Sequence, residues 1–119
     1  MKAKIRVTLT TEDGERFYGP GVQDLLTGIR KYSSVKEACT VMDLSYSKGR
    51  SILRHAEAVL GYQLVKRQRG GATGGSAVLT PKAEEFILRY QTLADSIHEY
   101  ASERMGDVFP PGNSSMKEG

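Results

Sequence analysis

Few residues of this 119-residue chain suit covalent or metal chemistry. It has one cysteine, two distant histidines and no tryptophan, so an internal disulfide is excluded and a zinc site lacks ligands. Cys39 falls on the apolar side of an expected helix, where a small buried hydrophobe is the simplest interpretation. No paired carboxylates, catalytic triad or metal-ligand cluster assembles in the sequence. We therefore expect no enzymatic activity, no metal and no cofactor.

Long hydrophobic runs are also missing. No apolar stretch approaches the length that spans a membrane, and the N-terminal letters MKAKIRVTLTT alternate instead of forming the apolar block of a signal peptide. We therefore expect a cytoplasmic protein with no membrane partner. The length fits one small domain, and 39% hydrophobic with 26% charged residues is typical of a globular one.

Positive charge is concentrated in the centre of the chain. The net charge is only +3, yet residues 45–70 contain six Lys and Arg against one Glu, a local charge of +5. A basic centre within a nearly neutral remainder is typical of a nucleic-acid-binding surface.

The stretch 33–60 predicts two helices separated by a tight turn. Ser34 and Glu37 have the spacing of a capping box, and the first helix follows them. After a break at 43–45, Ser45 can cap a second helix of about 45–60, and Gly61 can end it. This is the helix-turn-helix pattern, in which the second helix enters the DNA major groove.

The second helix has an apolar face and a basic polar face. Its first turns have cations near the positive end of the helix dipole, which weakly favours a bound anion there. A merely solvated surface helix would show a similar pattern. The expected DNA-facing residues are Tyr46, Ser47, Lys48, Arg50, Ser51 and Arg54.

A β-hairpin, or wing, is expected at about 64–80. Two short strand patterns flank a glycine-rich tip, where glycine permits positive φ and close approach to a partner. The tip lacks the Gly-Lys-Ser/Thr ending and following helix of a phosphate loop, but a plain flexible hairpin remains an alternative. The residues expected to hold the DNA backbone are Lys66, Arg67, Arg69, Gly71, Thr73 and Gly74.

The ends of the chain complete the expected fold. Strict alternation over 4–10 predicts a strand, residues 16–18 a returning strand, and Pro20 the first turn of a support helix. Thr80 and Pro81 should start a long helix of about 81–105, which Gly106 ends. Residues 106–119 read as a flexible tail.

Apolar residues along the long helix alternate in steps of four and three, as in a coiled coil. A homodimer would cover this stripe; packing on the N-terminal hairpin is the alternative, and both could share it. The expected dimerisation residues are Phe86, Tyr90, Leu93, Ile97 and Tyr100.

From about residue 4 to 105, the chain resembles the N-terminal winged helix-turn-helix domain of molybdate-dependent transcriptional regulators of the ModE type, distantly similar to LysR-type domains. Ser33 and Ala83 stand where that family usually has glycine. The molybdate-binding domains are absent, so molybdate binding is not expected in this chain. The matching segments are 17–21 (FYGPG), 34–38 (SVKEA), 44–46 (LSY), 70–77 (GGATGGSA) and 79–80 (LT).

We therefore expect an α+β, mostly α fold: a winged helix-turn-helix domain over 1–105 with an N-terminal β-hairpin and a long C-terminal dimerisation helix. The resemblance implies a homodimeric, sequence-specific transcription regulator that binds double-stranded DNA at a roughly palindromic operator. The alternative is a protein-interaction module on the same fold that has lost DNA binding. Arg54 is our candidate for a bidentate guanine contact.

Overall fold

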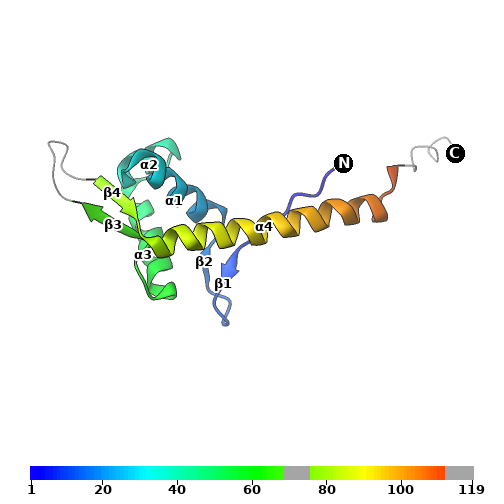
Figure 1. Cartoon of the computed structure of the whole chain (residues 1–119), viewed down its shortest axis with the longest axis horizontal. Helices are drawn as coiled ribbons and strands as arrows, with labels where there is room; N and C mark the ends of the chain where they lie inside the picture. Colours follow the sequence, from blue (N-terminus) through cyan, green and yellow to red (C-terminus); the bar gives the residue numbers. More distant parts are fainter. Residues whose placement is uncertain (69–75, 112–119) are drawn as a thin grey trace.

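The protein is described from a computed structural model, which covers residues 1–68 and 76–111 (Figure 1). Its elements, in chain order, are β1 (Leu9–Thr10), β2 (Arg16–Tyr18), α1 (Pro20–Tyr32), α2 (Val35–Val41), α3 (Tyr46–Leu60), β3 (Val65–Gln68), β4 (Ser76–Leu79) and α4 (Pro81–Val108). The strands form two antiparallel pairs, β1 with β2 and β3 with β4. The prediction of a mostly helical α+β fold with an N-terminal hairpin and a long C-terminal helix is confirmed.

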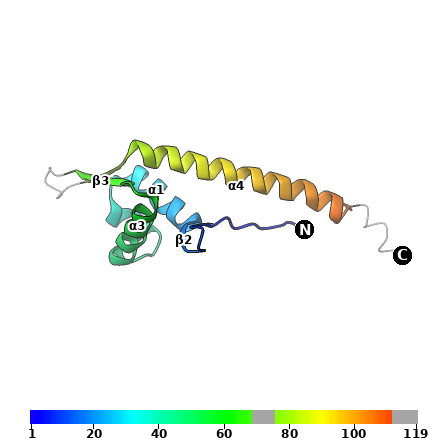
Figure 2. The ribbon, with the colours of Figure 1, turned by 90° about the horizontal axis from the view of Figure 1, so that it is seen from below.

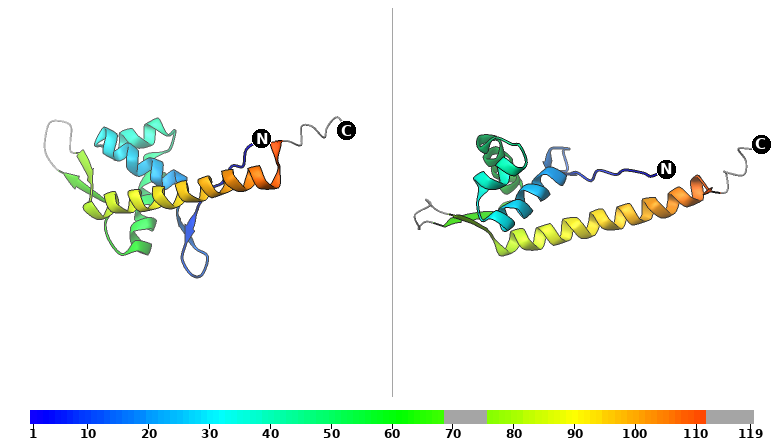
Figure 3. Two further views of the ribbon diagram at one scale, coloured as in Figure 1. Left: turned by 45° about the vertical axis from the view of Figure 1, so that its right-hand side comes forward. Right: turned by 90° about the horizontal axis from the view of Figure 1, so that it is seen from above.

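Helix α4 lies along one side of the molecule, and α1, α2 and α3 gather beside its N-terminal half (Figure 2). The C-terminal half of α4 extends beyond this helical body, and the N-terminal segment runs in the same direction (Figure 3). Among the described residues, no helix is both long and apolar enough to cross a membrane.

The predicted helix starts are confirmed. The side chains of Ser34, Ser45 and Thr80 each accept a hydrogen bond from the backbone amide three residues later, at 3.0, 3.1 and 3.1 Å. These bonds satisfy amides that have no partner within the helix. Pro20 and Pro81 occupy the first turns of α1 and α4, where their missing N–H costs nothing.

Tyr18 joins the N-terminal hairpin to α1 and α4. Its ring centroid lies 4.6 Å from that of Phe86 and 5.0 Å from that of Tyr90. Its hydroxyl donates to the Gln23 side chain, whose Nε2 donates to the Ile87 carbonyl at 3.0 Å. Burial raises the pKa of Tyr18, so the hydroxyl stays protonated and acts as this donor.

The predicted strand over residues 4–10 is mostly wrong. Only Leu9 and Thr10 pair with β2. The extended residues before them bind α4 instead: the Val7 carbonyl accepts from the Tyr90 hydroxyl at 2.7 Å, and the Ile5 carbonyl lies 3.0 Å from Nε2 of His98. Alternation correctly marked a half-buried extended segment but did not identify a helix as its neighbour.

The predicted end of the last helix is also wrong. Helix α4 continues through Gly106 to Val108, and the amide of Phe109 bonds to the Met105 carbonyl at 2.8 Å. A single glycine in an exposed helix costs only about 1 kcal/mol, which the preceding turns can offset. The expected tail therefore begins with helix, and residues 112–119 lie outside the described part of the chain.

The β3–β4 hairpin is attached to the helical body at both strands. Its register pairs Val65 with Leu79 and Arg67 with Ala77. The Ala77 amide donates to the Ser33 carbonyl at 2.9 Å, which connects β4 to the turn between α1 and α2. Pairing with β4 therefore places β3 beside the helices.

Candidate functional site

The position of helix α3 is determined by a close crossing with α2. A Cβ atom added to Gly49 would lie 2.3 Å from Sγ of Cys39, so the two helices approach at a distance that only glycine permits. Burial raises the pKa of the Cys39 thiol, so the thiol stays protonated. Gly61 ends α3 at φ 82°, a left-handed conformation that suits glycine, and the chain turns from there into β3.

A groove of about 260 Å³ lies between α3 and β3. It contains the guanidinium-bearing residues Arg50 and Arg54 of α3 and Arg67 of β3; we call it the α3–β3 groove. It thus brings together positive charge from two separate parts of the sequence. Its other lining residues are Val35, Leu53, Glu57, Gln63 and Val65.

Tyr46 connects the two sides of the α3–β3 groove. Its hydroxyl oxygen accepts a hydrogen bond from Nη1 of Arg50 at 3.1 Å and another from Nη2 of Arg67. Both guanidinium carbons also lie within 6 Å of the ring centroid, at 5.7 and 5.9 Å, a cation–π distance. The hydrogen bond from Arg67, followed by that from Arg50, lowers the pKa of the Tyr46 phenol, because two cations stabilise the phenolate.

Glu57 fixes the start of β3 against α3. Its Oε2 accepts from the Leu64 amide at 2.8 Å and from the Val65 amide at 3.3 Å. Among the described residues that line the groove, Glu57 is the only acid, and these bonds to backbone amides occupy the same carboxylate oxygen. The groove therefore presents a net positive charge.

The remaining predicted residues on α3 and β3 are exposed. Ser47, Lys48 and Ser51 lie on the open face of α3, and Lys66 is exposed on β3. Four residues expected in the wing lie outside the described part of the chain: Arg69, Gly71, Thr73 and Gly74.

The sequence interpretation missed the roles of Glu57 and His55. From the sequence alone, Glu57 only lowers the local positive charge by one, whereas in the structure it positions β3. Nε2 of His55 lies 3.2 Å from the Glu15 carboxylate and 3.0 Å from the Arg16 carbonyl, so this residue contacts the N-terminal hairpin. A lone acid within a basic segment was the available signal for Glu57; His55 had none, because its partners are distant in sequence.

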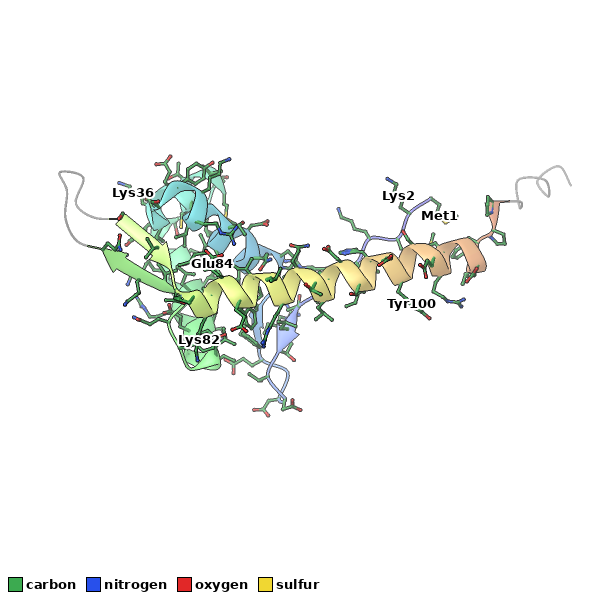
Figure 4. The ribbon with its side chains drawn as sticks, in the orientation of Figure 1. Met1, Lys2, Lys36, Lys82, Glu84 and Tyr100 are labelled. Carbon is green, nitrogen blue, oxygen red and sulfur yellow. The ribbon has the colours of Figure 1, made fainter. Side chains whose placement is uncertain are left out.

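The five apolar residues predicted on α4 fall into two environments. Phe86 and Tyr90 pack on Tyr18 of the same chain, as the alternative to a dimer anticipated. Leu93 and Tyr100 are 43% and 63% exposed, and Figure 4 shows Tyr100 on the side of α4 away from Met1 and Lys2. Ile97 is half-buried. Among the described residues, the predicted stripe is therefore covered at Phe86 and Tyr90 and exposed at Leu93 and Tyr100.

No protein-family model matches the chain, and no curated protein matches it. Within residues 1–68 and 76–111, no group of three or more His, Cys, Asp and Glu residues could hold a metal ion. The arrangement at the α3–β3 groove is suited to binding an anion through guanidinium groups held in place by Tyr46.

Proposed function

We propose that this protein is a sequence-specific DNA-binding transcription regulator with a winged helix-turn-helix fold. In this assignment α2 and α3 are the helix-turn-helix, α3 is the recognition helix and the β3–β4 hairpin is the wing. The resemblance to molybdate-dependent regulators supports the same proposal, without a molybdate site. Such a function agrees with the cytoplasmic location expected from the sequence.

The observation that carries this proposal is the α3–β3 groove. Arg50 and Arg54 on the helix and Arg67 on the hairpin line one concave surface, and a continuous positive surface is what a phosphate backbone requires. Tyr46 keeps Arg50 and Arg67 ordered before binding, so less side-chain entropy is lost when the ligand arrives.

The two parts of the surface have different proposed roles. Arg54 projects from the exposed face of α3 and would contact a base edge, where a bidentate guanine contact contributes about 1–3 kcal/mol of discrimination. Arg67 and Lys66 on the hairpin would contact phosphates beside the groove. Such contacts contribute affinity and register without sequence preference.

Helix α4 supplies the proposed homodimer contact. Leu93 and Tyr100 are large, exposed and three or four residues from Ile97, so a second copy of the helix could cover all three. A dimer would place two recognition helices about 34–36 Å apart, one turn of DNA. Changing Leu93 and Tyr100 to Glu should convert a dimer to a monomer in sedimentation equilibrium, whereas Ser102→Glu, on the opposite side of the helix, should not. A monomeric unmodified protein, or a dimer unaffected by the double change, would contradict this assignment.

A protein-interaction module is the second candidate. It is favoured by the exposed apolar residues of α4, including Leu88 at 67% exposure, because exposed apolar patches often bind other proteins. In that case the long helix would bind an unrelated partner and the α3–β3 groove would have no nucleic-acid ligand.

Selection of bound duplexes from a random pool separates these candidates. We expect enrichment of a roughly palindromic sequence by the unmodified protein. Arg54→Ala should reduce the sequence preference at particular base pairs, and Arg67→Ala should lower the affinity for all duplexes alike. No enrichment and no retention of duplex at low salt would favour the interaction module. Equal, non-selective weakening by both variants would contradict the division of roles.

A further inference from the structure

A second concave surface lies on the other side of α3, between this helix and the N-terminal hairpin. Its volume is about 370 Å³, within the range of small-molecule pockets. We call it the hairpin pocket. Its half-buried apolar lining includes Phe17 of β2, Met42 and Leu44 of the α2–α3 turn, and Ile52 of α3.

Two exposed arginines, Arg6 and Arg16, also line the hairpin pocket. The ion pairs formed among the described residues involve other cations, so neither arginine has an acidic partner there. The nearby Glu15 carboxylate is paired with His55 at 3.2 Å. The pocket thus combines an apolar lining with uncompensated positive charge.

We propose that the hairpin pocket binds a small carboxylate with an apolar body, of the size of an aromatic acid or a short-chain fatty acid. The guanidinium groups would bind the carboxylate, since a planar guanidinium matches carboxylate geometry. The apolar part of the ligand would cover Phe17, Leu44 and Ile52. This burial is favourable because it removes apolar surface from water. An inorganic anion would leave this apolar lining unused, and a neutral hydrocarbon would leave the arginines unused.

The position of the pocket gives such a ligand a route to the α3–β3 groove. Ile52 and His55 line the hairpin pocket, while Arg50 and Arg54 of the same helix line the groove. A ligand that binds one orientation of α3 better than another shifts the population toward that orientation. The ligand would therefore change duplex affinity, and this second consequence rests on the proposed DNA-binding function.

Binding can be tested without DNA by nuclear magnetic resonance titration of the full chain. The probes are benzoate and hexanoate, with benzamide, hexanamide and inorganic phosphate as matched comparisons. We expect the two carboxylates to shift the signals of Phe17, Met42, Leu44 and Ile52. The amides should bind at least about tenfold more weakly than the carboxylates, because they lack the charge-assisted contact. Phosphate should leave these signals unchanged.

Variants localise the effect. Arg16→Gln should weaken carboxylate binding by about tenfold, while Arg89→Gln, which removes the same charge from the exposed surface of α4, should change it less than twofold. Thermal unfolding confirms that both variants are folded. Equal binding of carboxylate and amide, equal effects of the two variants, or no binding of either carboxylate would overturn the proposal. A positive titration without any duplex binding would retain the pocket and reject only the DNA-binding function.

Discussion

Both hairpins of the molecule are attached to α3, but they carry opposite charge. The β1–β2 turn contains Glu12, Asp13 and Glu15, whereas β3 contains Lys66 and Arg67. Each hairpin is held by a side chain of complementary character: His55 contacts the acidic hairpin, and Glu57 binds the start of the basic one.

This difference explains why only one side of α3 is a candidate for nucleic acid. The acidic turn would repel a phosphate backbone, while β3 adds Arg67 to the guanidinium groups of Arg50 and Arg54. Glu57 and His55 are two positions apart on one helix, so α3 separates the acidic β1–β2 turn from the basic strand β3.

The largest expected difference is in apolar anchoring. Leu64, just before β3, is fully buried, whereas Leu9 in β1 is half-buried. Leu64→Ala should lower the free energy of unfolding by about 2–5 kcal/mol, as expected for a buried leucine that leaves a cavity. Leu9→Ala should cost about 1 kcal/mol, the typical effect of a point mutation. Urea unfolding measures both, and equal losses would contradict the comparison.

The polar attachments should differ less. Glu57→Ala leaves two partly buried amides, those of Leu64 and Val65, without their acceptor. This change should lower the free energy of unfolding by about 1–3 kcal/mol. His55→Ala should cost about 0.5 kcal/mol or less, because this contact lies at the surface. Glu57→Gln is the matched control, since its amide oxygen can still accept. If Glu57→Gln were as destabilising as Glu57→Ala, charge and not hydrogen bonding would hold β3.

Local signals were sufficient to predict most elements. A short stretch of sequence reveals the cap residues Ser45 and Thr80 and the turn glycine Gly61, because each of them acts on backbone only a few residues away. One exception is the end of α4: a glycine shortly before a Pro-rich stretch resembles a helix end, but a well-formed helix can continue through it.

Contacts between distant residues were less accessible. The basic residues of the α3–β3 groove were predicted, but the bond between Tyr46 and Arg67 joins positions 21 apart in sequence. Likewise, residues 4–10 alternate as a strand would. Their contact with α4, however, depends on hydrogen bonds to the distant residues Tyr90 and His98. Periodicity indicates which face is buried without identifying the element that covers it.

Tyr46→Phe should have a smaller effect, confined to the basic side of α3. The ring remains, but the phenol oxygen that accepts from Arg50 and Arg67 is lost, so ordering of the two guanidinium groups weakens. We expect duplex affinity to fall by about 0.5–1.5 kcal/mol, the net value of a hydrogen bond. Tyr32→Phe, at a half-buried tyrosine of α1 that does not line the groove, is the control in the same binding assay. Equal effects of the two changes would argue against a role for the Tyr46 hydroxyl.

The smallest expected effect is on tyrosine ionisation. Arg67 and Arg50 lower the pKa of Tyr46 below its ordinary value of 10.0, because cations favour the charged phenolate. In an ultraviolet titration, Tyr46 should ionise at lower pH in the unmodified protein than in Arg67→Ala. Subtracting the titration of Tyr46→Phe isolates this residue. An unchanged midpoint in Arg67→Ala would show that the bond does not persist in solution.

The most direct test of the central claim is duplex affinity measured over a series of salt concentrations. We predict a steep linear fall of log affinity with log salt for the unmodified protein. Arg67→Ala should reduce that slope by about 0.9, the value of one phosphate contact on duplex DNA, and Arg89→Ala on α4 should leave it unchanged. No duplex binding at low salt, or the same slope in both variants, would contradict the account.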